Sequence, residues 1–187
     1  NLSALSNLRN LSEFKMEGCH EPVSDISCFT KLTQLTNLDL AYTKITDPNG
    51  ISSLAGLTNL KSLSLKRDYA DETFWQPDLS SLQGLTLLEE LDVSSTKCQD
   101  FSFAANMRLM KKLDLSFSKF TDIEACANME HLNYLKMSCM GKVSLVPLRN
   151  LKNLTYFDLE GGWRNEGIDD LPANVVFYVN GVRETWR

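Results

Sequence analysis

The sequence predicts an α/β solenoid, a curved right-handed stack of β-α coils. We expect parallel strands on its concave face and short helical or 3-10 turns on its convex face. Two observations predict this fold. A motif of spaced leucines recurs along the chain, and within each copy apolar residues stand two positions apart, as in a strand with one buried face. One strand cannot bury that face alone, so the copies must stack on one another.

The repeat is clearest at residues 35–45, which read LTNLDLAYTKI. Corresponding positions in successive copies are held by Met16, Leu40, Leu65, Val93, Leu115, Met137 and Leu159. Their spacings are 24, 25, 28, 22, 22 and 22 residues. A 22-residue unit with a few insertions explains all of them. A frame that recurs this often indicates a repeat architecture.

This motif resembles the LxxLxLxxNxL template of leucine-rich repeats, with Thr43 where the template has Asn. The resemblance covers about residues 5–165. The segments between strands, such as 51–57 and 123–129, are similar to the short 22-residue subclass, which includes bacterial internalins and repeats of the phosphatase-regulator type. The resemblance implies a short strand on the concave side of each coil and a turn of 3-10 or α-helix on the convex side.

The position that holds Asn in the template is expected to form a ladder of side chains that bond to the backbone inside each turn. Here it is held by Cys19, Thr43, Asp68, Thr96, Ser118, Met140 and Gly162. Thr, Ser and Asp can still form such hydrogen bonds. Met and Gly have no hydroxyl or amide side chain, so we expect the ladder to weaken toward the C-terminus.

The organisation predicted is a single domain over 1–187, with about seven repeats over 5–165 and a C-terminal cap over 166–187. The rhythm breaks after Leu159, and the apolar run at 171–179 predicts a β-rich cap in which Trp163 and Trp186 pack. The long third unit carries extra residues within 66–77. There Phe74 and Trp75 are either a second contact point or fold back onto the core.

Composition excludes several function classes. A net charge of −5 with scattered basic residues argues against nucleic-acid binding, which depends on clustered Lys and Arg. No apolar run approaches the roughly 20 residues that a bilayer-spanning helix needs, so no membrane insertion is expected. The sequence contains no nucleotide-binding, hydrolase or metal-ligand motif. We therefore expect no enzyme, no cofactor, no metal and no small-molecule substrate.

The cysteines suggest a compartment. They are odd in number and dispersed, at Cys19, Cys28, Cys98, Cys126 and Cys139. This pattern favours free, buried thiols in a reducing, cytoplasmic setting, with a Cys19 to Cys28 bridge as the weaker alternative. The chain begins at Asn1 without Met and inside a repeat, which suggests a trimmed chain. A secreted protein whose signal peptide was removed is therefore the alternative.

Alternation places two residues of each strand on the concave face, and corresponding residues form columns across the stack. One predicted column contains Glu13, Asn37, Ser62, Glu90, Lys112, Tyr134 and Tyr156. The next contains Lys15, Asp39, Ser64, Asp92, Asp114, Lys136 and Asp158. Stacked aromatics among mixed charges are typical of an interface centre. The partner-binding residues predicted are Tyr134, Tyr156, Phe117, Asp114, Lys136, Asp158, Tyr42 and Arg67.

A plainer interpretation of the same columns is a solvated sheet whose charges pair with each other and add little stability. Asp92 and Asp114 share a column and could attract a cation or a basic side chain of a partner. Lys112 and Lys136 lie near enough to neutralise them, and we favour neutralisation.

The function predicted is a non-catalytic module that binds a protein partner on its concave face. One alternative is the targeting or regulatory segment of a larger enzyme, such as a ubiquitin ligase or phosphatase complex. Another is an internalin-like bacterial surface or effector protein. The repeat scaffold itself does not choose between them, because one architecture hosts many functions.

Overall fold

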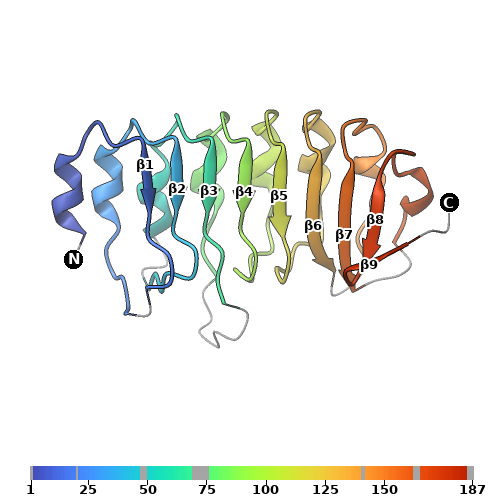
Figure 1. Ribbon diagram of the computed structural model, residues 1–187, viewed down its shortest axis with the longest axis horizontal. Coiled ribbons are helices and arrows are strands. Elements are labelled where there is room, and N and C mark those ends of the chain that lie inside the picture. Colours follow the sequence, from blue (N-terminus) through green and yellow to red (C-terminus); the bar gives the residue numbers. More distant parts are fainter. Residues whose placement is uncertain are drawn as a thin grey trace.

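The computed structural model describes residues 2–19, 21–46, 50–68, 76–139, 142–161 and 165–184. Within these ranges the strands form one sheet in which each strand neighbours the next in the chain (Figure 1). The pairs from β1 to β8 are parallel, and β9 pairs antiparallel with β8. The strands are β1 Glu13–Lys15, β2 Asn37–Asp39, β3 Ser62–Ser64, β4 Glu90–Asp92, β5 Lys112–Leu115, β6 Tyr134–Cys139, β7 Tyr156–Gly161, β8 Val176–Val179 and β9 Val182–Arg183.

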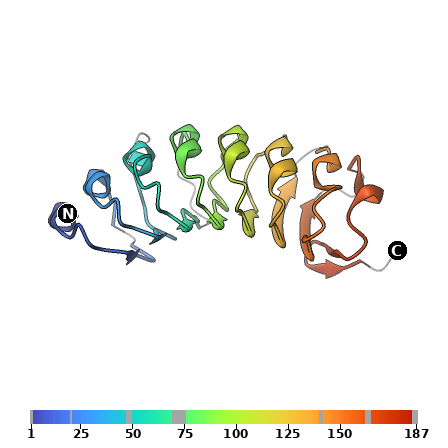
Figure 2. The same ribbon diagram turned by 90° about the horizontal axis from the view of Figure 1, so that it is seen from above.

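Short 3-10 helices lie between the strands. They are η1 Ser3–Asn7, η2 Ser27–Lys31, η3 Gly50–Leu54, η4 Ser80–Gly84, η5 Ser102–Asn106, η6 Glu124–Asn128, η7 Val146–Leu148 and η8 Ile168–Asp170. Figure 2 shows them along the outer, convex side, with the strands on the inner side. The predicted solenoid is thereby confirmed. None of the helices described is long and apolar enough to cross a bilayer.

The core lies between the sheet and the helices, and the predicted leucine frame builds it. The register aligns one buried leucine from each central strand: Leu38, Leu63, Leu91, Leu113 and Leu135. Their neighbours on either side in each strand face the solvent or are half-buried. Each coil therefore covers the apolar edge of the next, which makes stability a sum of contacts between neighbours.

Hydroxyl groups supply much of the ladder inside the turns. Thr43 donates its Oγ1 hydrogen bond to the Met16 carbonyl at 2.7 Å. Thr96 and Ser118 both donate to the Val93 carbonyl, at 2.7 and 3.0 Å. These bonds confirm that hydroxyls serve in place of the template amide. The predicted weakening rests on positions 140 and 162, which lie outside the described residues.

The C-terminal end of the sheet differs from the repeats. Here β8 follows the short η8 and adds to β7, and β9 turns back along β8. Leu171, Phe177 and Val179 are buried against the last repeats. Trp163 and Trp186 lie outside the described residues, as do Phe74 and Trp75. The domain limits assigned from the sequence stay predictions.

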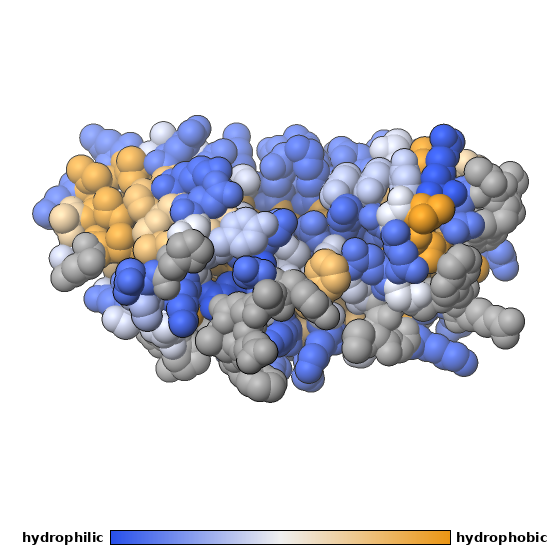
Figure 3. All heavy atoms as spheres, turned by 60° about the horizontal axis from the view of Figure 1, so that its bottom comes forward, coloured by the Kyte–Doolittle hydropathy of each residue, from blue (hydrophilic) through white to orange (hydrophobic). Residues whose placement is uncertain are grey.

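The opposite end is less well covered. Leu2, Leu5, Leu11 and Phe14 are only partly buried, and Leu8 is 50% exposed. Figure 3 shows the apolar side chains gathered at this N-terminal end of the molecule. The first coil has a neighbour on only one side among the described residues, so its apolar edge keeps more contact with water.

The cysteines described are free thiols, and Cys28, Cys98 and Cys126 are buried in the core. Burial raises the pKa of Cys98 to about 11 and that of Cys126 to about 12. These thiols therefore stay protonated at neutral pH and act as small apolar core residues. Cys19 and Cys28 are not bridged. The side chain of Cys139 lies outside what the structure describes.

Aspartates organise the starts of several helices. In four repeats an Asp Oδ1 accepts a hydrogen bond from the backbone N–H two residues on, at 2.8 Å: Asp25, Asp78, Asp100 and Asp122. The first N–H groups of a helix have no partner inside it, so these carboxylates satisfy donors that the short 3-10 turns leave open. Hydrogen bonding from the serine two positions on lowers the pKa of Asp25, Asp78 and Asp100.

Acid is expected to destabilise the fold through these three carboxylates. Their folded-state pKa lies below the ordinary 3.8, so their contribution is complete above that value and is lost as pH falls through the lowered value. Thermal unfolding followed by circular dichroism between pH 6 and pH 2 should show this loss. A variant with Asn at all three positions keeps the acceptor oxygens and should lose less stability over the same range. Equal acid sensitivity in both proteins would contradict the assignment.

Candidate functional site

The solvent-facing side of the sheet carries the columns that the sequence predicts. Glu13 pairs with Asn37, and the same column continues through Ser62 and Glu90. It then passes through Lys112, Tyr134 and Tyr156. The second predicted column is also in register, from Lys15 to Asp158. The regular spacing of the buried leucines is what fixes this alignment.

Three tyrosines stack across β6, β7 and β8. The ring centroids of Tyr134 and Tyr156 are 4.6 Å apart with an interplanar angle of 6°. Tyr178 continues the row, 4.9 Å from Tyr156 at an angle of 32°. All three side chains are half-buried. Burial raises the pKa of Tyr134 and Tyr156, so both phenols are neutral at physiological pH.

Sequence reasoning placed Tyr134 beside Tyr156 but missed Tyr178. This residue lies in β8, where the leucine frame has ended and no column position could be assigned. A signal was present: Phe177 and Val179 are buried on either side of Tyr178, which is strand alternation with the tyrosine facing outward. The register pairs Tyr178 with Asp158.

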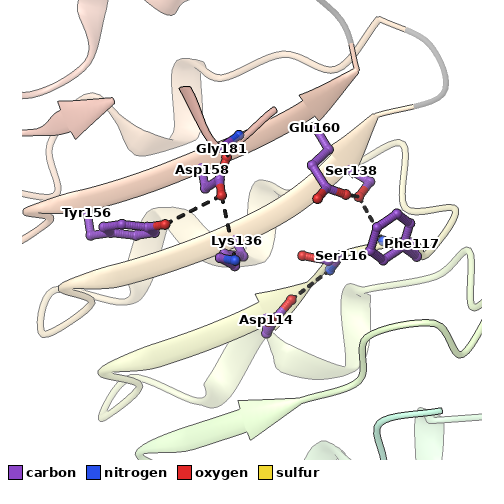
Figure 4. A network of polar contacts seen from close by, with 9 residues as sticks. All are labelled: Asp114, Ser116, Phe117, Lys136, Ser138, Tyr156, Asp158, Glu160 and Gly181. Atoms are coloured by element: carbon purple, nitrogen blue, oxygen red, sulfur yellow. Dashed lines mark hydrogen bonds and ion pairs between the residues drawn. The ribbon is translucent and has the colours of Figure 1, made fainter. Parts of the chain in front are cut away.

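Asp158 is the main correction to the predicted contact residues. Its side chain is 5% exposed, so it is not available for direct contact with a partner. It accepts hydrogen bonds from the Gly181 N–H at 3.2 Å and the Tyr156 hydroxyl at 3.4 Å, and pairs with Lys136 at 3.6 Å. The β8–β9 hairpin folds over this carboxylate. Asp158 therefore ties the last strands to the repeats and orients Tyr156 and Lys136 (Figure 4).

A second chain of hydrogen bonds supports Phe117, just after β5. The Phe117 N–H donates to Ser138 Oγ at 2.7 Å, and that hydroxyl donates to Glu160 Oε2 at 2.8 Å. Asp114 accepts from the Ser116 N–H at 2.9 Å. Figure 4 shows these contacts joining β5, β6 and β7 on the same face as Tyr156. The network fixes the backbone that presents the Phe117 ring.

Phe117 is held in an unusual conformation. Its φ is 54°, in the left-handed region that disfavours bulky residues, and its side chain is 44% exposed. Tyr42 and Ser95 hold corresponding positions with φ of 57° and 60°, whereas Gly18 meets the same requirement with 69°. A strained aromatic that remains largely exposed contributes little to the core. Such strain often marks functional positions.

The Phe117→Gly variant is expected to keep its free energy of unfolding within about 1 kcal/mol of the parent. Relief of left-handed strain, about 1–2 kcal/mol, offsets the packing lost with a half-exposed ring. Urea unfolding measures the difference. Phe117→Val is the matched comparison: its β-branched side chain keeps the strain, so it should be the less stable of the two. A Gly variant destabilised by more than about 2 kcal/mol would show that the ring is a packing residue.

Tyr42 and Arg67, the predicted contact residues near β2 and β3, differ in exposure. Tyr42 is 38% exposed, with the Lys66 ammonium 5.4 Å from its ring centroid. Arg67 is 5% exposed and donates from Nη1 to the Thr43 carbonyl. Its buried side chain is therefore not available for the predicted contact. Asp68 at the predicted ladder position is exposed instead.

The lysines near the tyrosines pair differently from the prediction. Lys112 binds Glu90 at 2.7 Å, and Lys136 binds Asp158 at 3.6 Å. Asp92 and Asp114 form no ion pair with any residue that the structure describes. The favoured neutralisation therefore does not take the form of a direct ion pair, although the charge of Lys136 acts on Asp114 and that of Lys66 acts on both aspartates. Desolvation by burial and the charge of Asp114 raise the pKa of Asp92 against the hydrogen bonds from Ser94.

A hollow of about 230 Å³ opens on this face between β3 and β6. Short side chains, Ser62 and Ser64, form the floor on the β3 side. The rest of its polar lining comes from Glu90 and Asp92 of β4, Lys112 and Asp114 of β5, and Tyr134 of β6. The hollow exists because two serines occupy column positions that hold long or aromatic side chains in later strands.

The described residues offer no group of three or more His, Cys, Asp or Glu side chains placed to hold a metal ion. The carboxylates of Asp39, Asp92 and Asp114 instead accept hydrogen bonds from the backbone N–H two residues on, at 2.9 Å each. These bonds stiffen the strand ends. The aspartates of this face are therefore fixed in place by the backbone of their own strands.

Known structures share this architecture. An internalin from Listeria monocytogenes is 26% identical, with a TM-score of 0.73 over 95% of this chain and 50% of that one. Internalin C2 of the same bacterium is 24% identical, with a TM-score of 0.77 over 92% of this chain and 72% of that one. The Arabidopsis receptor kinase HAESA, solved with the peptide hormone IDA and the co-receptor SERK1, is 20% identical, with a TM-score of 0.63 over 93% and 29%.

The chain is a leucine-rich-repeat protein. No family model and no curated protein sequence matches it. This leucine-rich-repeat protein spans half the length of the first internalin and less than a third of the receptor kinase chain. Its assignment to the 22-residue subclass stays a prediction.

Proposed function

We propose that this leucine-rich-repeat protein is a module that binds a protein partner on its concave face and catalyses no reaction. The observation that carries the proposal is the row of tyrosines on the solvent-facing side of β6 to β8. Aromatic side chains that are rigid and partly exposed are the residues that contribute most at interface centres. A sheet needs no such row on its outer face in order to fold.

Two further features support the same face. Phe117 lies at the other end of the strands from the tyrosine row (Figure 4), and its backbone is fixed by Ser138 and Glu160 before any partner arrives. A surface ordered in advance loses less conformational entropy on binding. Among the neighbours, the solved complex of the Arabidopsis receptor kinase contains a peptide hormone and a co-receptor, which supports a polypeptide as partner here.

The non-catalytic part of the proposal rests on how the polar groups are used. The carboxylates of the face accept backbone hydrogen bonds or pair with lysine. Two serine hydroxyls of the face do bond to carboxylates, Ser94 to Asp92 at 2.6 Å and Ser138 to Glu160 at 2.8 Å. Both pairs also hold backbone N–H groups at the strand ends, and neither pair has a histidine among its hydrogen-bond partners in the described residues to complete a catalytic triad. The likeness to two internalins favours an internalin-like surface or effector protein as the setting, over a segment of a eukaryotic enzyme complex.

Site-specific photo-crosslinking tests where the partner binds. The photoreactive residue p-benzoylphenylalanine replaces Phe117 on the proposed face. In a control protein it replaces Leu109, which is similarly exposed at 39% but lies before β5. Both proteins are irradiated in extract of the source organism and of its host, if it has one. We expect one polypeptide to be labelled from position 117 and not from position 109. Equal labelling from both positions, or none from position 117, would contradict the proposal.

A further inference from the structure

We propose that the hollow between β3 and β6 receives an arginine side chain of the partner. This inference rests on the proposed function, because it assigns part of the same concave face. It identifies the partner as a polypeptide that presents an exposed arginine. Three features support it: the shape of the hollow, the aromatic ring at its edge and the charge around it.

The ring of Tyr134 provides the wall. Tyr156 covers the face of that ring that is turned toward β7, with the two planes within 6° of each other. The opposite face is turned toward β5 and lines the hollow. Tyr134 is thus the end of the tyrosine row, and its register neighbour on this side is Lys112, whose ammonium is drawn toward Glu90. Planar guanidinium groups stack on aromatic ring faces and are attracted by the ring quadrupole.

The charge of the hollow fits a cation. Its lining contains Glu90, Asp92 and Asp114 against the single ammonium of Lys112. Lys112 is already 2.7 Å from Glu90, which leaves two carboxylates without an ion pair among the described residues. Both carboxylates are fixed by backbone N–H groups through one oxygen, Oδ1. A guanidinium can bond to the remaining oxygens while it stacks on the ring.

The other cations nearby attract the two unpaired carboxylates of the hollow through their charge but form no ion pair with them among the described residues. Lys66 lies over the ring of Tyr42, 5.4 Å from its centroid. Lys136 pairs with Asp158. The hollow has a volume of about 230 Å³, which is room for one long side chain but not for a folded segment. Arginine fits better than lysine because the ring and the carboxylates favour a planar group with several donors.

A peptide titration tests the assignment with the 187-residue chain. The probe is acetyl-Gly-Gly-Arg-Gly-Gly-amide, followed by NMR of the Tyr134 ring and of the Leu91 and Leu113 methyl groups. The peptide with citrulline in place of arginine has nearly the same shape without the charge. We expect saturable shifts at these three residues with arginine, weaker ones with lysine and none with citrulline. Equal shifts from the arginine and citrulline peptides would overturn the inference, and equal affinity for lysine would overturn the choice of arginine.

Variants test the groups that hold the probe. Asp92→Asn with Asp114→Asn is expected to weaken binding of the arginine peptide by about tenfold or more, because the charge-assisted bonds are lost. Asp39→Asn removes a carboxylate from the same column outside the hollow and should leave the affinity unchanged. Circular dichroism checks that each variant is folded, and Tyr134→Leu tests the ring if the double variant is not. Unchanged affinity in the folded double variant or in Tyr134→Leu would overturn the inference.

Two outcomes separate this inference from the proposed function. Calcium chloride that shifts the same resonances as strongly as the arginine peptide would overturn it in favour of a cation site. Photo-crosslinking from position 117 without any response to the arginine peptide would also overturn it, while the concave face remained the binding surface.

Discussion

The Phe157→Ala variant is expected to unfold with a free energy about 3–5 kcal/mol lower than the parent. Phe157 is fully buried in β7, in register with Leu135 on one side and Phe177 on the other. Its ring centroid lies 5.2 Å from that of Phe177. Truncation removes a large apolar side chain and leaves a cavity where the last repeat meets β8. Chemical denaturation followed by circular dichroism measures the loss.

Leu109→Ala is the control for this variant. Leu109 is 39% exposed, so its truncation should cost less than about 1 kcal/mol. Contacts in a solenoid are made only between neighbours. The Phe157→Ala protein should therefore lose amide protection first in β7 and β8, as measured by hydrogen exchange. Destabilisation below about 2 kcal/mol, or uniform loss of protection along the chain, would contradict this account.

The Tyr156→Ala variant is expected to weaken binding of the captured partner by about 2 kcal/mol, which is about thirtyfold in Kd. Tyr156 is the centre of the tyrosine row, so its removal takes away ring contact and frees Tyr134 and Tyr178 from their common neighbour. Surface plasmon resonance or calorimetry with the purified partner measures the change.

Tyr156→Phe is the matched control for affinity. It keeps the stacked ring and loses only the hydroxyl that donates to Asp158 at 3.4 Å. If the ring carries the binding energy, this variant should bind within about threefold of the parent. An Ala variant that binds as tightly as the parent would remove the tyrosine row from the interface.

Tyr156 and Phe157 are adjacent in β7 but face opposite sides of the sheet. Their truncations should therefore separate affinity from stability. Phe157→Ala should affect unfolding far more than binding at temperatures where the protein is folded. Tyr156→Ala should show the reverse.

Much of the fold could be predicted because the leucine frame fixes several things together. It sets where strands lie, which residues are buried and how neighbouring strands align, so Tyr134 and Tyr156 were placed side by side from their positions alone. Period-two alternation allows only one assignment of faces once the leucines are inside. The regular columns of the site follow directly from the regular columns of the core.

The parts that could not be predicted lie where the frame ends or changes. Tyr178 follows the last full repeat, so no column could be assigned to it. Arg67 had a column position, but that position does not reveal that its side chain is buried. Asp158 is buried by the β8–β9 hairpin, which no repeat pattern describes. The choice of Lys112 between Glu90 and the neighbouring aspartates depends on side-chain rotamers. Spacing along the sequence carries no information about rotamers.

The antiparallel β9 has a consequence for engineering this scaffold. A parallel sheet can be lengthened by adding one more coil, but the edge of β8 is already paired with a strand of opposite direction. The Gly181 N–H also holds that hairpin to Asp158 at 3.2 Å. A designed extra coil would have to be spliced in before β7, so that the hairpin is carried along intact. An insertion at that point would lengthen the solvent-facing sheet without leaving an unpaired edge strand that could pair with another chain.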